Sequence, residues 1–235
     1  MSEKGVGLSE LPRNRLLAEF SIWSANLVRI ADDVARVDPY VDIYHADVAD
    51  GHFSPALLLF PDLMAQIRSI TSKPIHIHLM VSDKVLLDQI DQFAESGADI
   101  ISIHAENSNL DEALDRIHGH GLAAGVVLQL HSPIEGSEAF IQRVEMLTLL
   151  GTRIGIKGVG LDAAAETRLE TARKLIDRQD DDRRILLAAD GGIREHTVPG
   201  LRKSGADTIV MGSLAFGADD LTARMNWVHG LPGNH

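Results

Sequence analysis

The stretch Tyr44-His45-Ala46-Asp47-Val48-Ala49-Asp50-Gly51-His52-Phe53 decides how the rest of this chain is interpreted. It follows the apolar run from Val41 to Ile43 and predicts the end of a strand that runs into a loop. Residues two apart on a strand point to the same face, so His45 and Asp47 should project side by side. An imidazole beside a carboxylate is half of a site for a divalent metal, although solvated strand-end residues would give the same pattern.

Composition limits the classes of protein that fit. The chain has 235 residues, of which 45% are hydrophobic, enough for one sizeable core. A net charge of −12 argues against a nucleic-acid partner, because binding a phosphodiester backbone needs a basic face. There is no cysteine, which excludes disulfides and thiolate metal sites and is compatible with the cytoplasm. We find no signal peptide and no run of membrane-span length, and we therefore predict a cytoplasmic protein without a membrane partner.

Short apolar runs alternate with amphipathic runs along the whole chain. The apolar runs have hydrophobic residues on both faces, as strands buried on both sides do. Eight such alternations, spaced by roughly 27 residues, predict an α/β fold and a single (β/α)8 TIM barrel. We expect a lead-in over residues 1–14, the barrel over 15–229 and a tail over 230–235. The expected strands are Leu16–Phe20, Val41–His45, Ile75–Leu79, Ile100–His104, Ala123–Leu128, Met146–Leu150, Ile185–Ala189 and Thr208–Met211.

In such a barrel the chemistry lies at the carboxyl ends of the strands. The polar residues expected at those ends are Ser21, His45, Asp47, His78 and Asp190. The two histidines and two aspartates form an N₂O₂ ligand set that suits Zn²⁺, Fe²⁺, Co²⁺ or Mn²⁺. Two carboxylates on separate strands also fit a two-base proton transfer, in which one removes a proton beside a carbonyl and the other returns one to the opposite face.

Other polar residues have a structural or an open interpretation. We expect His76 to be a hydrogen-bonded core histidine, and Asp50 to shape its loop. His104 and Glu106 could either line the mouth of the barrel or be solvated. The histidines expected at the surface include His118, His120 and His131.

Glycines after the last two strands indicate phosphate binding. Asp190–Ile193 and Met211–Ser213 place small residues where backbone N–H groups can approach an anion, at the usual phosphate site of this fold. The glycine-rich segment 151–160, which we call loop six, could close over a ligand.

Five ordered segments resemble the ribulose-phosphate 3-epimerase family, over about Leu17 to Phe216. The segment at 45–53 is similar to the family's His-x-Asp-Val-Met-Asp-Gly-x-Phe. The segment at 76–81 resembles Val-His-Leu-Met-Val, with the family's histidine at His78. The other three segments resemble Pro-Ser-Ile-Leu-Ser-Ala-Asp, Val-Asp-Gly-Gly-Ile and Gly-Ser, and they are Phe20–Asn26, Ala189–Ile193 and Met211–Ser213.

The resemblance implies one divalent metal, usually zinc but also iron, manganese or cobalt. It implies His45, Asp47, His78 and Asp190 as ligands, with Asp47 and Asp190 doubling as the catalytic acid and base. It also implies a small phosphorylated sugar as the partner, and we expect a homo-oligomer. The residues expected to bind the substrate are Ser21, His78, Met80, Gly158, Gly160, Gly191, Gly192, Gly212 and Ser213.

Three departures from the family pattern bear on the substrate. Phe20 replaces a proline, Ala49 replaces a methionine, and loop six reads Gly-Thr-Arg-Ile-Gly-Ile-Lys-Gly-Val-Gly. We therefore predict a metal-dependent 3-epimerase of the ribulose 5-phosphate/xylulose 5-phosphate type that acts through an enediolate. We further predict that another ketose phosphate, a tetrulose or a hexulose such as allulose 6-phosphate, is preferred to ribulose 5-phosphate.

Two alternatives to an epimerase stay open. A non-catalytic phosphosugar-binding barrel would have no need of two opposed bases. A metal-free decarboxylase of the orotidine-phosphate type would need a lysine where this chain has Ala49.

Overall fold

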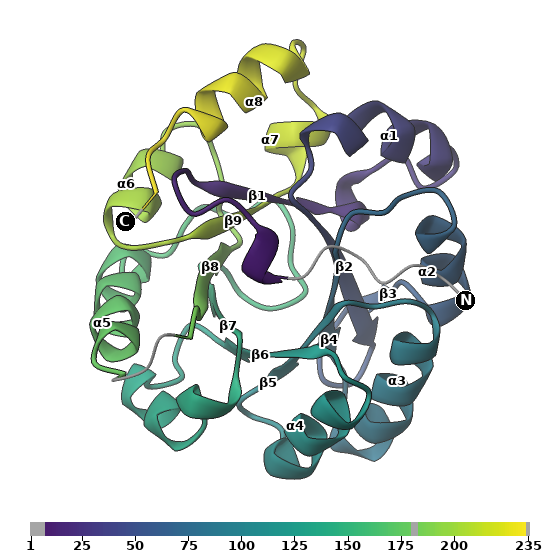
Figure 1. The fold of residues 1–235 in the computed structure, drawn as a ribbon, viewed down its shortest axis with the longest axis vertical. Coiled ribbons are helices and arrows are strands. Elements are labelled where there is room, and N and C mark those ends of the chain that lie inside the picture. The colour runs from purple at the N-terminus through teal and green to yellow at the C-terminus, as the bar shows by residue number, and fades with distance from the viewer. Residues whose placement is uncertain (1–7, 180–182, 234–235) are drawn as a thin grey trace.

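Eight parallel strands close into a barrel within residues 8–179 and 183–233, which are the residues that this computed structural model describes. Helices surround the barrel (Figure 1), and β9 hydrogen-bonds to β1 to close it. The prediction of a single (β/α)8 barrel is confirmed. The barrel strands are, in spatial order, β1 (Leu17–Ser21), β2 (Ile43–Asp50), β4 (Ile75–Met80), β5 (Ile100–His104), β6 (Ala123–Leu128), β7 (Met146–Leu150), β8 (Leu186–Asp190) and β9 (Thr208–Met211).

Most of the longer helices are amphipathic and pack one apolar face against the outside of the barrel. In α3 (Asp83–Glu95), for example, the buried residues Leu86, Ile90 and Phe93 recur at helical spacing. The helix ends where Gly97 adopts a φ of 95°, a conformation that favours glycine. The other helices are α1 (Ile30–Val37), α2 (Pro61–Arg68), α4 (Leu110–Gly119), α5 (Ala165–Asp177), α6 (Val198–Lys203), α7 (Ser213–Phe216) and α8 (Leu221–His229), with 3₁₀ turns η1 (Leu8–Glu10), η2 (Ile22–Ser24), η3 (Asp38–Tyr40), η4 (Ile134–Ala139) and η5 (Ile141–Arg143).

Strand β2 is longer than the sequence predicted. It does not end at His45 but continues to Asp50, because β4 pairs with it as far as Ala49 and the two-residue strand β3 (Leu57–Leu58) pairs antiparallel with Ala49 and Asp50. His45 and Asp47 are therefore held inside a strand, not at its junction with a loop. The backbone of His45 pairs with β1 on one side and β4 on the other, and the backbone of Asp47 pairs with β4.

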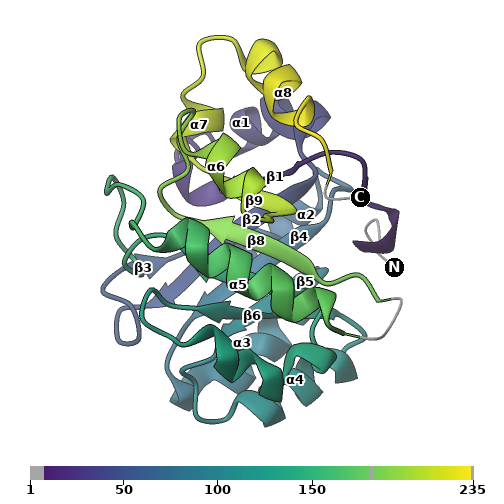
Figure 2. The same cartoon turned by 90° about the vertical axis from the view of Figure 1, so that its left-hand side faces the viewer.

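The interior of the barrel is built in layers, because alternate residues of each strand point inward. An apolar layer at the amino ends of the strands includes Leu17, Ile43 and Met146, and Leu11 packs against it. The purple segment around η1 lies at this end of the barrel, opposite β3 (Figure 2). The next inward positions along β1 and β2 are Glu19 and His45, so a polar layer lies above the apolar one.

The segment before the first strand meets the segment after the last helix. The N–H of Leu16 donates to the carbonyl of Leu231 at 2.9 Å, and Arg15 and Pro232 form a β-bridge. The predicted lead-in and tail fall partly outside the described residues, since 1–7 and 234–235 are not among them. Among the described helices none has the length and apolarity to cross a membrane.

Candidate active site

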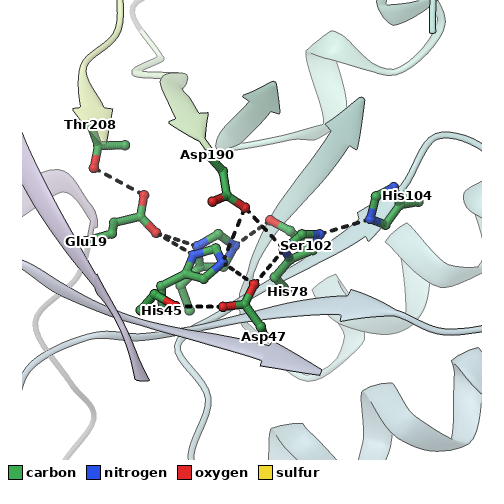
Figure 3. Close-up of polar contacts among 10 residues, drawn as sticks. Glu19, His45, Asp47, His78, Ser102, His104, Asp190 and Thr208 are labelled. Atoms are coloured by element: carbon green, nitrogen blue, oxygen red, sulfur yellow. Dashed lines mark hydrogen bonds and ion pairs between the residues drawn. The ribbon is translucent and has the colours of Figure 1, made fainter. Parts of the chain in front are cut away.

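His45, Asp47, His78 and Asp190 converge at the carboxyl end of the barrel (Figure 3). They come from β2, β4 and β8, and the β2–β4 register places Asp47 beside His78. Nε2 of His45 lies 3.3 Å from Oδ1 of Asp47 and 3.9 Å from Oδ2 of Asp190. Nδ1 of His78 lies 3.4 Å and 3.7 Å from the same two oxygens. Strands far apart in the sequence thus place four side chains around one point.

The chemistry of these four residues fits a divalent metal ion. One ligand atom from each lies within 4.8 Å of all the others. Nε2 of His45 and Nδ1 of His78 are buried and have no hydrogen-bond partner within the described residues. Buried polar atoms without a partner are costly, and a cation between two imidazoles and two carboxylates would satisfy both nitrogens. The predicted ligand set is therefore brought together in a geometry that could hold a metal.

The opposite ring nitrogen of each histidine contacts a second group. Nδ1 of His45 lies 3.1 Å from Oε2 of Glu19. Nε2 of His78 lies 2.9 Å from Nε2 of His104, whose Nδ1 lies 3.1 Å from Oε2 of Glu106. With the proton of His78 on Nε2 and that of His104 on Nδ1, each ring donates to the next group and Nδ1 of His78 keeps a free lone pair.

The sequence left His104 open as either a residue at the mouth or a solvated one. It neither lines the mouth nor contacts solvent, but is buried behind His78. Glu19 was missed altogether, although a glutamate in an otherwise apolar strand was a signal that it needs a buried partner. His76, by contrast, is a buried hydrogen-bonded residue, as predicted.

Burial and neighbouring charges separate the two candidate acid–base residues. Burial opposes the ionisation of Asp47, but His45 and His78 more than offset it and hold its pKa far below the usual value. Burial raises the pKa of Asp190; the two histidines oppose that rise and the Asp47 carboxylate adds to it. Burial also disfavours a charged His45, yet Asp47, Glu19 and Asp190 raise the pKa of that ring well above its usual value. In the protein without a cation, Asp190 therefore holds a proton more readily than Asp47.

Two residues at strand ends beside the site have structural roles. The Ser21 hydroxyl donates to Oδ2 of Asp47 at 2.8 Å, which orients the carboxylate from β1. Asp50 accepts hydrogen bonds from the N–H groups of His52, Phe53 and Ser82. Asp50 thus shapes its loop, as expected.

A cavity of about 640 Å³ opens directly above Asp47, His78 and Asp190. This is the size of a small-molecule site. Of the residues predicted to bind the substrate, Gly160 does not line the cavity. Those that do are Ser21, His78, Met80, Gly158, Gly191, Gly192, Gly212 and Ser213.

Cationic side chains also line this cavity. They are Arg153, Lys157 and Arg194. Nζ of Lys157 donates to the carbonyl of Trp23 at 2.6 Å and lies 4.2 Å from the centroid of the Trp23 ring. Loop six is thereby fastened to the segment after β1, across the mouth of the barrel.

Ala49 does not line the cavity. It is buried, and its backbone pairs with Leu58 on one side and Met80 on the other. Met80 itself lines the cavity. The methionine-to-alanine departure is therefore not among the residues that line the cavity.

Imidazoles and carboxylates converge at one end of a closed parallel barrel, beneath a cavity that cationic side chains line. These features define an α/β-barrel protein whose site suits proton transfer on a small anion. The model of the ribulose-phosphate 3-epimerase family matches residues 17–216, and the chain belongs to that family. This match covers all eight barrel strands.

Curated relatives of similar length support the assignment. Ribulose-phosphate 3-epimerase 1 of Cupriavidus necator is 35% identical over 204 residues, which cover 85% of this chain and 84% of the relative. Ribulose-phosphate 3-epimerase of Bacillus subtilis is 29% identical over 212 residues, covering 89% and 96%. Among solved structures, a 3-hexulose-6-phosphate synthase superposes with a TM-score of 0.66 at 16% identity, covering 92% of this chain and 99% of that one. At that identity the likeness shows the fold alone.

Proposed function

We propose that this protein is a metal-dependent 3-epimerase of a phosphorylated ketose. The observation that carries the proposal is the convergence of Asp47 and Asp190, from β2 and β8, on the same two imidazole nitrogens. A binding module has no use for two carboxylates placed in this way. Inversion at a carbon beside a carbonyl, in contrast, requires one group to remove a proton and a second to deliver one.

The four proposed ligands are His45, Asp47, His78 and Asp190. A divalent cation held there would polarise the ketone and offset the negative charge of the enediolate. Asp47 and Asp190 would each remove a proton from carbon 3 or return one, from opposite faces of the sugar. Ser21 would keep Asp47 oriented through its hydrogen bond, so that the carboxylate oxygen facing the cavity stays in place.

The rest of the cavity supports a phosphorylated substrate. Gly191 and Gly192 have φ values of 88° and 72°, and a Cβ at Gly192 would lie 2.7 Å from the backbone of Leu161. Glycine is therefore needed for this turn, which brings backbone close to the cavity. Gly212 and Ser213, which follow β9, also line the cavity. Together these four residues offer backbone rather than bulky side chains to an anion.

Loop six supports a ketose phosphate other than ribulose 5-phosphate. Residues 152–159 all line the cavity, and this is where the chain departs most from the family pattern. The residues proposed for proton transfer, at the base of the cavity, match the family pattern. The part of the cavity wall that loop six forms does not match it. A tetrulose or hexulose phosphate is therefore the proposed preferred substrate, with the ribulose 5-phosphate/xylulose 5-phosphate pair as the alternative.

Zinc is the proposed metal, because a mixed imidazole and carboxylate set at short range suits it, with iron, manganese and cobalt as alternatives. A homo-oligomer is proposed because Val28, Leu57 and Phe60 expose apolar side chains. The cytoplasmic location and the lack of nucleic-acid or membrane partners stay predictions from the sequence.

A turnover panel tests the proposal. The protein is loaded with Zn²⁺, Fe²⁺, Co²⁺ or Mn²⁺ and assayed with tetrulose, pentulose and hexulose phosphates in D₂O. We expect deuterium at carbon 3 of the product and the highest kcat/KM for a sugar other than ribulose 5-phosphate. Turnover without exchange at carbon 3 would refute the two-base scheme. If ribulose 5-phosphate has the highest kcat/KM of the panel, at about 10⁴ M⁻¹s⁻¹ or more, only the proposed substrate preference would be refuted.

A further inference from the structure

A second cluster of ionisable residues shares His45 with the candidate metal ligands, and the proposed reaction does not use its other two members. Glu19, His45 and His76 place ligand-type atoms within 4.8 Å of one another, and all three are buried. Glu19 comes from β1 and faces the barrel interior one layer below Ser21. Figure 3 shows its carboxylate pointing at the side of the His45 ring that faces away from Asp47 and Asp190.

The contacts of Glu19 form a chain across the barrel. Its Oε2 accepts from Nδ1 of His45 at 3.1 Å and from Nδ1 of His76 at 2.7 Å, while Oε1 accepts from the Thr208 hydroxyl at 3.2 Å. Nε2 of His76 accepts from the Ser102 hydroxyl at 2.7 Å. Every member of this chain is fully buried, so each hydrogen bond has no competition from water.

Neighbouring backbone is shaped to allow this chain. A Cβ at Gly125 would lie 2.0 Å from the Ser102 hydroxyl oxygen. Glycine on β6 thus leaves the space in which Ser102 reaches His76. The position of Glu19 is therefore set by strands β4, β5 and β9 together, and not only by its own strand.

We infer that Glu19 is a positioning residue for the metal ligand His45. By accepting the Nδ1–H, it fixes the ring in the tautomer that leaves the Nε2 lone pair facing Asp47, His78 and Asp190. Metal-binding histidines generally donate their other ring N–H to such a group, which orients the ring and makes the ligand more basic. His76 and Thr208 hold Glu19 in turn. This inference rests on the proposed function, because it needs a metal at the four ligands.

The two histidines are then supported differently. His45 donates directly to a carboxylate, whereas His78 reaches Glu106 only through His104. His45 uses Nε2 toward the site and His78 uses Nδ1, so each ring needs its own acceptor to set the opposite tautomer. Glu19 supplies that acceptor for His45.

Metal affinity is the measurement that separates positioning from a purely structural role. Zn²⁺ and Co²⁺ affinities are measured by chelator competition for wild type, Glu19→Ala, Glu19→Gln and a control, Met146→Ala. Met146 lies in the apolar layer below the cluster, so its loss should lower the midpoint of thermal unfolding without changing the ligands. We expect Glu19→Ala to bind about 10–100-fold more weakly. Glu19→Gln, which keeps an acceptor oxygen but loses the charge, should show a smaller loss, and Met146→Ala should bind as wild type does.

A nuclear magnetic resonance readout needs neither metal nor turnover. In wild type the His45 Nδ1–H should give a signal that exchanges slowly with solvent, and Glu19→Ala should lose it. Glu19→Ala with wild-type metal affinity would overturn the inference while leaving the proposed function intact; wild type that binds no divalent metal would overturn both. If Glu19→Ala does not fold, either of two results would overturn the inference. One is a metal affinity of Glu19→Gln equal to that of wild type, and the other is the absence of the Nδ1–H signal in wild type.

Discussion

Asp47 and Asp190 approach the same nitrogen, Nε2 of His45, from two strands that are not neighbours in the barrel: Oδ1 of Asp47 lies at 3.3 Å and Oδ2 of Asp190 at 3.9 Å. Two carboxylates this close to one imidazole, without an intervening cation, would repel each other. Part of this repulsion is relieved because burial and the Asp47 carboxylate raise the pKa of Asp190, so that Asp190 holds a proton more readily than Asp47 does. The same arrangement gives any ligand above it a carboxylate on each side.

The first prediction concerns the metal. The purified protein should hold about one divalent ion per chain, and chelation should abolish turnover, which Zn²⁺, Fe²⁺, Co²⁺ or Mn²⁺ should partly restore. His78→Ala should lower the metal content measured by elemental analysis, since it removes one of four ligands. His120→Ala, at the surface, should keep it. A fully active preparation free of metal would contradict the ligand assignment.

The second prediction concerns the two bases. Asp190→Asn should reduce turnover by about 10²–10⁴-fold, the usual cost of losing an acid–base group. Exchange of the carbon-3 hydrogen with D₂O should continue from one face, because Asp47 still contacts the site. Epimerisation and exchange are measured in the same sample by nuclear magnetic resonance. Undiminished epimerisation by Asp190→Asn would rule out its role as a base.

The third prediction concerns loop six. Lys157→Met keeps most of the apolar stem but loses the hydrogen bond to Trp23 and the contact with its ring, which together stabilise closure by about 1–2 kcal/mol. We expect KM for the best substrate to rise by about tenfold, with a smaller change in kcat. Lys174→Met, on the exposed side of α5, is the matched control. An unchanged KM would mean that loop six does not hold the substrate through Lys157.

The fourth prediction concerns stability at the other end of the barrel. Burial opposes the ionisation of Asp42, but Arg15, His229 and the N–H of Ala18 more than offset it and lower its pKa from 3.8 to about 2. Because the folded-state pKa is the lower one, the ionised carboxylate stabilises the fold above about pH 4, and this contribution is lost as the pH falls toward 2.

Asp42→Asn should therefore lower the free energy of unfolding by about 2 kcal/mol at neutral pH. The difference from wild type should shrink between about pH 4 and pH 2, as measured by urea unfolding. Activity per folded molecule should not change, since Asp42 directly precedes β2 and does not line the cavity. A difference that stays constant over this pH range would refute the ion-pair explanation.

The sequence by itself determined the barrel and the four proposed ligands. Apolar runs with two buried faces and helical runs with one leave few alternatives to a parallel barrel, and strand periodicity fixes that His45 and Asp47 share a face. Parallel strands in a barrel also end on one side, so His78 and Asp190 had to come near them. These properties follow from local spacing and from the closure of the sheet.

Only the tertiary structure decided which residues contact the ring nitrogens of the ligand histidines that face away from the site. Glu19 and His45 are 26 positions apart, and Glu19 and Thr208 are 189 apart, so no local spacing reveals their contacts. The register between strands and the layer that each residue occupies are set by packing of the whole barrel. The same holds for Lys157 on Trp23, 134 residues away, because a loop's position depends on the side chains that it meets across the mouth.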